Sequence, residues 1–331
     1  MTRIGVLGAG SWGTALADLL ARKGHAVRIW AREAEVVASI NSQHENHLFL
    51  AGHGLAPSVV AYPDARDVVG EAEVVVSAAP SHAVRQVIGE VAGVIPAGAL
   101  IVSATKGIED ASLARMSEVI QSVVHGARVA VLSGPSFASE VAAGQPTAVV
   151  AASADAPAAA RTQELFSTPA FRVYTNQDVI GVELGGSLKN VIAIAAGTLE
   201  GLGLGHNARA ALLTRGLAEI TRLGTALGAE PPTFAGLAGM GDLILTATGS
   251  LSRNRALGMA LAHGESFGAW QARNRTVAEG ANTSRAAARL AGRAGVEMPI
   301  ADEVLAVLFE GKPARDSVRD LMERELKAEQ W

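Results

Sequence analysis

Short apolar runs alternate with amphipathic stretches over the first half of the chain. Each run is rich in valine, isoleucine, leucine and alanine and has the length of one buried strand. Continuous apolar strands that alternate with helices are typical of a parallel sheet with helices on both faces. The pattern predicts a Rossmann-type, mainly parallel sheet, with strands at 4–7, 26–30, 73–78, 100–104, 129–132, 147–152 and 171–174.

The strand pattern stops near residue 180, and apolar positions then recur at helical spacing between glycines. We expect helices at 181–199, 207–228, 233–237, 240–247, 252–262, 282–294, 300–309 and 315–327. The chain is therefore predicted to be an α/β protein with two domains. A Rossmann-type domain that contains the sheet would span residues 1–178, and an all-helical domain would span residues 179–331.

A glycine-rich turn, Gly8-Ala9-Gly10-Ser11-Trp12-Gly13, follows the first predicted strand and opens a helix. Gly8 permits the tight turn, Gly10 removes a side chain that would block a pyrophosphate, and Gly13 lets helix and strand pack closely. Free N–H groups at the helix start would face the phosphates. The motif predicts a dinucleotide site, and Trp12 is expected to pack over the loop or to line the cofactor.

The end of the second predicted strand bears on the choice of cofactor, because this position meets the adenosine ribose. Arg32 can pair with a 2′-phosphate and so favours NADP, whereas Glu33 keeps NAD possible. The alternative for Arg32 is an exposed residue at a helix start.

Residues 40–62 contain Asn41, His44, His47 and His53 in a polar stretch. His44 and His47 have helical spacing, but no carboxylate partner is evident. We expect a solvated loop here and no metal site anywhere in the protein.

Three candidate ligand contacts follow predicted strands, at the edge where ligands of such sheets bind. Lys106 is a candidate substrate contact or a surface lysine. Gly134 and Ser136 can offer an N–H group and a hydroxyl to a polar substrate, or can cap the next helix.

The stretch 181–197 is expected to be a helix that begins polar and turns apolar. Apart from Glu183, its only ionisable residue is Lys189, just before the apolar run 191–196. Burial disfavours the ammonium form, so a lysine drawn into the interior can exchange a proton near neutral pH. The alternative is a lysine whose stem lies on apolar surface while its amine reaches water.

Two later stretches contain polar residues that can complete a site together with that lysine. Asp242 ends a glycine-dense run and is expected either to cap a helix or to orient Lys189 or a substrate hydroxyl. Ser252, Arg253 and Asn254 open another helix, where a hydroxyl, a guanidinium, an amide and free N–H groups suit a phosphate. An ordinary capped basic helix is the alternative.

Composition narrows the classes of function. The 331 residues are 49% hydrophobic and 18% charged, with a net charge of −4, which argues against a broad nucleic-acid-binding face. The absence of cysteine excludes disulfides, thiolate metal sites and cysteine nucleophiles.

The first strand is expected to begin at Arg3 or Ile4, leaving no room for a signal peptide, and no apolar run has the length of a membrane span. We therefore expect a cytoplasmic protein without membrane insertion.

Taken in order, the motifs resemble those of the bacterial type of NAD(P)-dependent glycerol-3-phosphate dehydrogenase, along the whole chain. The matching stretches are 8–17, 103–109, 132–138, 185–197, 236–246, 252–258 and 277–280. The resemblance implies interconversion of dihydroxyacetone phosphate and sn-glycerol 3-phosphate by hydride transfer with NADPH or NADH, NADP(H) being favoured. It also implies a supply of glycerol 3-phosphate for glycerophospholipid synthesis, and a homodimer.

The resemblance also implies roles for individual residues. Lys189 would be the general acid/base, assisted by Asp242 and Thr246. The substrate would contact Lys106, Gly134, Ser136, Asp242, Ser252, Arg253 and Asn254. The cofactor would contact Gly8, Gly10, Ser11, Trp12, Gly13, Arg32, Lys106, Ala138, Arg253, Val277 and Glu279, although Glu279 can also be read as a plain surface acid.

Two other readings stay open at this point. One is a 3-hydroxyacid dehydrogenase of the 6-phosphogluconate dehydrogenase type, which the phosphate site at 252–254 disfavours. The other is a non-catalytic NADP sensor, which has no need of Lys189 or Lys106 beside the nicotinamide.

Overall fold

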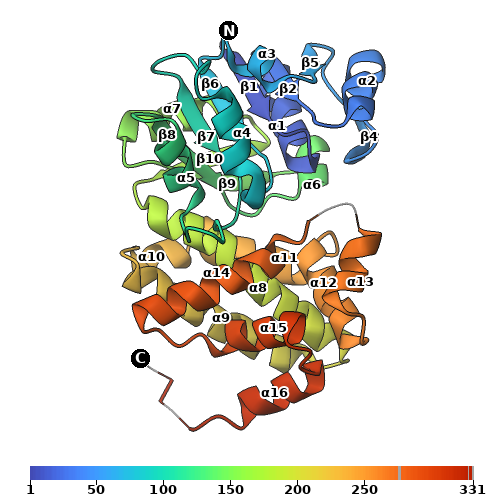
Figure 1. Cartoon of the computed structure of the whole chain (residues 1–331), viewed down its shortest axis with the longest axis vertical. Helices are drawn as coiled ribbons and strands as arrows, with labels where there is room; N and C mark the ends of the chain where they lie inside the picture. Colours follow the sequence, from blue (N-terminus) through green and yellow to red (C-terminus); the bar gives the residue numbers. More distant parts are fainter. Residues whose placement is uncertain (275–276, 327, 330–331) are drawn as a thin grey trace.

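A computed structural model describes residues 1–274, 277–326 and 328–329. The chain up to Asn176 forms a sheet flanked by helices. From Val179 onward, every described element is a helix. The two parts lie one above the other, with the sheet in blue to green and the helices in yellow to red (Figure 1).

The sheet has eight strands in the order β10-β9-β8-β7-β6-β1-β2-β5. The six strands from β5 to β8 run parallel, which confirms the predicted mainly parallel architecture. Their bounds are β1 Arg3–Leu7, β2 Ala26–Trp30, β5 Val59–Tyr62, β6 Val74–Ser77, β7 Leu100–Ser103, β8 Arg128–Ser133, β9 Thr147–Ala152 and β10 Phe171–Asn176.

The last two strands reverse direction. β9 pairs antiparallel with β8, and β10 then pairs parallel with β9. The chain leaves β8 through the five-residue helix α6 (Ala138–Ala142) and returns beside it, whereas a parallel return would need a crossover over one face. The apolar pattern of β9 does not encode this direction.

Helices cover both faces of the sheet because successive strand residues point to opposite sides. On β6, Val74 and Val76 pack with α1 (Ser11–Arg22) and α7 (Ala156–Phe166), while Val75 packs on the other side. That other side carries α3 (Ala65–Val69), α4 (Val84–Val91) and α5 (Met116–Val123). The strands are apolar on both faces for this reason.

α8 (Val179–Gly201) forms the centre of the helical part and is apolar around its circumference. It has the length and hydropathy of a membrane span, contrary to the expectation that no run is long enough, but 83% of its apolar window is buried within the protein. α8 is therefore a core helix of the protein. Around it pack α9 (His206–Ala226), α11 (Asp242–Thr248), α12 (Arg253–Ala262), α14 (Glu279–Ala294) and α15 (Pro299–Phe309).

Some predicted boundaries were wrong. Residues 40–62 are not a loop: they contain the end of α2 (Ala34–Gln43), a hairpin of β3 (Glu45–Asn46) and β4 (Leu50–Gly54), and the edge strand β5. The short polar hairpin has no apolar alternation that would reveal it. α13 (Phe267–Arg273) was not predicted, and the helix expected at 233–237 ends at Phe234, in α10 (Pro231–Phe234), before a π-helical turn, η2 (Leu237–Gly241). α16 (Ala314–Met322) is shorter than expected, and residue 327 lies outside the described residues.

Polar contacts hold α8 and α14 against the sheet part. Glu183 is buried and accepts hydrogen bonds from Arg115 Nη1 (2.7 Å) and from the N–H and hydroxyl of Ser117 (2.8 and 2.6 Å). Ser187 Oγ accepts the N–H of Gly107 at 2.9 Å, directly after Lys106. These bonds fix the loop that carries Lys106 relative to the helix that carries Lys189.

Glu219 of α9 caps α15 from inside the helical part. It is 3% exposed and accepts the N–H groups of Ile300 (2.9 Å) and Ala301 (3.3 Å). Burial raises the pKa of Glu219 from its ordinary value of 4.5 to about 7, although the two N–H groups oppose the shift.

We expect the free energy of unfolding to fall as the pH rises from about 4.5 to about 7, because over this range the folded protein binds the Glu219 proton and the unfolded chain releases it. The contribution is on the order of 3 kcal/mol. Glu219→Gln should remove this slope in urea unfolding measured from pH 4.5 to 8. The exposed Glu310→Gln is the control, and an unchanged slope in Glu219→Gln would contradict the assignment.

Candidate active site

Asp242 bridges two lysines at the junction of the sheet and the helices. The amine of Lys189 donates to Asp242 Oδ1 and to Thr246 Oγ1, the latter at 2.5 Å. The amine of Lys106 donates to Asp242 Oδ2 at 2.6 Å and to the carbonyl of Gly134 at 2.9 Å. Lys189 is 5% exposed and Asp242 is 1% exposed, so this cluster is nearly closed to bulk water.

Local structure explains how these side chains meet. Lys106 follows β7 and Gly134 follows the neighbouring parallel strand β8, so both lie at the carboxyl edge of the sheet. Gly134 has φ +141°, and a Cβ there would lie 2.9 Å from Cα of Val149, so glycine is required. Asp242 opens α11, which places Thr246 one turn later on the same face.

Burial gives Lys189 an unusual pKa. Loss of hydration lowers the pKa of this amine from 10.5 to about 7, the carboxylate of Asp242 opposes the shift, and the positive charge of Lys106 reinforces it. A group with this pKa is poised to give and take a proton at neutral pH.

A second polar group adjoins the lysines through Asn190, the residue after Lys189. Asn254 Nδ2 donates to Asn190 Oδ1 at 2.9 Å, and Asn254 Oδ1 accepts the N–H of Gly280 at 3.0 Å. The prediction from the sequence gave Asn190 no role. The signal that points to Asn190 is its place in the chain directly after Lys189.

The start of α12 brings together groups that can bind an anion. Ser252 occupies the N-cap and accepts the N–H of Arg255 at 3.2 Å. Arg253 is exposed and donates no hydrogen bond to any other described residue. Its guanidinium and the positive end of a ten-residue helix are thus available to one ligand.

The glycine turn has the shape that a dinucleotide requires. Gly8 has φ +115°, and a Cβ at Gly10 would meet no atom within 4 Å, so open space lies beside the backbone there. A Cβ at Gly13 would collide with the carbonyl of Gly8. The first N–H groups of α1, from Ser11 onward, have no acceptor within their helix, and the turn fits a pyrophosphate.

Other predicted cofactor residues lie around the same edge. The indole N–H of Trp12 is buried without an acceptor among the described residues, and Trp12 and Ala138 are both partly buried against the same core cluster. Glu279 accepts the N–H (3.1 Å) and hydroxyl (2.5 Å) of Ser81, so it joins α14 to the end of β6.

The remaining predicted residues lie outside the lysine cluster. Ser136 Oγ donates to the Gly134 carbonyl at 3.0 Å, while Val277 is half-buried in the segment before α14. Arg32 does not contact the lysines and instead pairs with Glu33 at the end of β2. Within the described residues, no group of three or more His, Asp or Glu side chains is placed to hold a metal ion.

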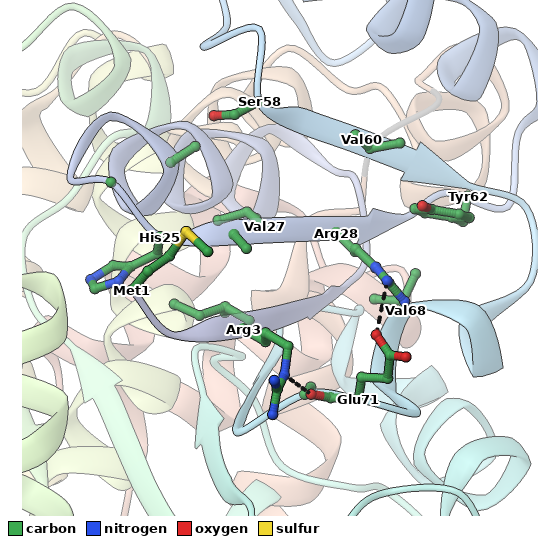
Figure 2. A pocket seen from close by; sticks show the side chains of 15 residues that line it. Met1, Arg3, His25, Val27, Arg28, Ser58, Val60, Tyr62, Val68 and Glu71 are labelled. Carbon is green, nitrogen blue, oxygen red and sulfur yellow. Dashed lines mark hydrogen bonds and ion pairs between the residues drawn. The ribbon is translucent and has the colours of Figure 1, made fainter.

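A separate hollow of about 390 Å³ lies at the opposite, amino edge of β1 and β2 (Figure 2). Met1, His25, Val27 and Tyr62 are among its lining residues, together with Arg28, which is bonded to Glu71 at 3.0 Å (Figure 2). None of the predicted site residues lines it, so this hollow is not the candidate active site.

Comparisons with known proteins agree with this geometry. Residues 3–159 match the family described as NAD-dependent glycerol-3-phosphate dehydrogenase N-terminus, and residues 178–319 match the corresponding C-terminus. The chain is 55% identical to glycerol-3-phosphate dehydrogenase [NAD(P)+] of Geobacter sulfurreducens over 99% of both chains, and 52% identical to that of Koribacter versatilis over 100% of both. The crystal structure of glycerol-3-phosphate dehydrogenase from Coxiella burnetii superposes with a TM-score of 0.94 at 40% identity, covering 98% of this chain and 99% of that one.

Replacing Asp242 by Asn is expected to lower the pKa of Lys189 below 7, because the carboxylate that stabilises the ammonium is lost while burial and Lys106 remain. The titration of ¹³C-labelled lysine side chains by NMR measures this shift. Glu200→Gln breaks an ion pair with Arg255 elsewhere on α8 and should leave the Lys189 titration unchanged. A pKa that rises in Asp242→Asn would contradict the description of the cluster.

Proposed function

The chain belongs to the NAD(P)-dependent glycerol-3-phosphate dehydrogenase family, and we propose that Lys189 is the general acid/base of the reaction. The protein interconverts dihydroxyacetone phosphate and sn-glycerol 3-phosphate with NADPH or NADH. The observation that carries the proposal is the buried amine of Lys189, held by Asp242 and Thr246 at the carboxyl edge of the sheet.

The chemistry of Lys189 follows from its surroundings. When bound, the nicotinamide supplies or accepts the hydride at the carbon that carries the reacting oxygen. In reduction, the Lys189 ammonium gives its proton to the oxygen as negative charge develops there, and in oxidation the neutral amine takes that proton from the hydroxyl. Asp242 holds the amine in place, and Lys106 adds a second positive charge beside the reacting oxygen.

The phosphate of the substrate is assigned to the start of α12. Ser252, Arg253 and Asn254 would bind it through the hydroxyl, the guanidinium and the amide, while Gly134 and Ser136 would contact the remainder of the triose. Asn190 and Gly280 hold the Asn254 amide in one orientation, which supports this assignment.

The cofactor is assigned to the glycine turn, with its 2′-phosphate, when present, on Arg32, so that NADP(H) is favoured. Trp12, Ala138, Val277 and Glu279 would complete that site. We treat residues 1–178 and 179–331 as the two domains between which both ligands lie. With relatives that carry the dehydrogenase name over their full length, the hydroxyacid dehydrogenase and sensor readings are set aside.

Four wider properties belong to the same proposal. The enzyme would act in the cytoplasm as a homodimer, and its product would supply glycerophospholipid synthesis. The net charge of −4 supports the absence of a nucleic-acid partner.

Lys189→Ala is expected to reduce kcat by about 10²- to 10⁴-fold, the usual contribution of a general acid/base, with nearly unchanged cofactor affinity. In the wild type, kcat/KM for reduction should fall as the pH rises above about 7, and oxidation should show the reverse, because each direction needs the opposite form of Lys189. Steady-state assays from pH 5.5 to 9 measure both. Lys189→Arg retains the charge but cannot exchange the proton, so a nearly active Arg variant would remove Lys189 from the proton transfer.

Arg253→Ala is expected to raise KM for dihydroxyacetone phosphate by about ten- to a hundredfold, since a hydrogen bond to a charged group is lost. Initial-rate assays at saturating cofactor give the value. Arg273→Ala, at the end of α13, is the matched control and should behave as wild type. An unchanged KM in Arg253→Ala would contradict the phosphate assignment.

A further inference from the structure

Arg32 and Glu33 form an ion pair at the end of β2. Arg32 Nε and Nη2 both donate to Glu33 Oε1, at 3.2 and 2.9 Å. The Arg32 side chain is 83% exposed and that of Glu33 is 28% exposed, so a ligand can reach both. Arg32 donates to no other acceptor among the described residues.

The register of the sheet places this pair beside the glycine turn. Trp30, the last residue of β2, lies opposite Leu7, the last residue of β1, and its carbonyl accepts the N–H of Gly8 at 3.3 Å. Arg32 is two residues beyond Trp30, and Gly10 is three residues beyond Leu7. The pair and the pyrophosphate turn therefore leave neighbouring strands at the same edge.

The two members of the pair have opposite preferences for the adenosine ribose. A guanidinium stabilises a 2′-phosphate, whereas a carboxylate repels it and accepts a hydrogen bond from a free 2′-hydroxyl. Glu33 already occupies two of the five N–H donors of Arg32, so a 2′-phosphate has to share the guanidinium with this carboxylate.

We propose that Glu33 is a specificity-determining residue that weakens NADP(H) binding and provides NAD(H) binding, so that one site accepts both cofactors. The inference rests on the proposed role of Arg32 and extends it. In the NADP(H) complex Arg32 divides its donors between Glu33 and the phosphate, and in the NAD(H) complex the Glu33 carboxylate binds the ribose hydroxyl.

The test is the dissociation constant of each cofactor, measured by isothermal titration calorimetry without substrate. Glu33→Gln should bind NADP⁺ about three- to tenfold more tightly and NAD⁺ more weakly by a similar factor. Glu33→Ala, a second neutral variant, should change the ratio of the two constants in the same direction. In Arg32→Ala, NADP⁺ should bind about tenfold or more weakly while NAD⁺ changes little.

Glu265→Gln is the matched control, because Glu265 also accepts the Nε and Nη2 of an arginine, Arg273, through Oε1 and Oε2 at 2.7 and 2.8 Å, in the helical part. It should leave both constants unchanged. In the double variant Arg32→Ala/Glu33→Gln, the gain in NADP⁺ affinity from Glu33→Gln should become smaller, since the competition for the guanidinium is gone.

The experiment distinguishes a failure of the role inferred for Glu33 from a failure of the role proposed for Arg32. If Arg32→Ala weakens NADP⁺ selectively but the Glu33 variants leave the ratio unchanged, the role of Glu33 is overturned and that of Arg32 stands. If Arg32→Ala affects both cofactors equally, the proposed 2′-phosphate contact itself is wrong.

Discussion

The structure depends on one carboxylate shared by two lysines. Asp242 is 1% exposed, and its two oxygens bind Lys106 and Lys189 separately. Burial lowers the pKa of Lys189, the more buried of the two lysines, to about 7, because the Asp242 carboxylate, shared with Lys106, offsets the loss of hydration only in part. The arrangement therefore places an amine with a pKa near neutrality next to a second lysine.

This cluster requires that the sheet and the helical part keep fixed positions relative to each other. α8 fixes these positions because it carries Lys189, binds the Lys106 loop through Ser187, and binds α5 of the sheet part through Glu183. Glycines permit the necessary close packing: a Cβ at Gly185 would lie 2.8 Å from the carbonyl oxygen of Ala238, which belongs to the π-helical turn η2 directly before Asp242. The low polarity of α8 agrees with its central position, where 83% of its apolar window is buried within the protein.

Three features of the backbone carry the proposed ligand contacts: the glycine turn after β1, the start of α12, and the end of β2 with the Arg32–Glu33 pair. In the proposed function the glycine turn would bind the pyrophosphate and the start of α12 would bind the substrate phosphate. Each uses a helix start or a strand end, where backbone groups are free and side chains are exposed.

Local patterns in the sequence were sufficient for much of this description. The alternation of apolar runs and helices predicts the sheet. The glycine spacing at 8–13 predicts the tight turn, and the apolar run after Lys189 predicts a buried helix. Each of these features depends on residues that are close in the chain.

Tertiary structure decided the rest. The contact of Lys189 with Asp242 joins residues 53 positions apart, and that of Ser81 with Glu279 joins residues 198 apart. The reversal of β9 and the hairpin within 40–62 likewise depend on what packs beside them. A pKa near 7 for Lys189 is a property of this assembled environment, because burial and neighbouring charge exist only after the chain has folded.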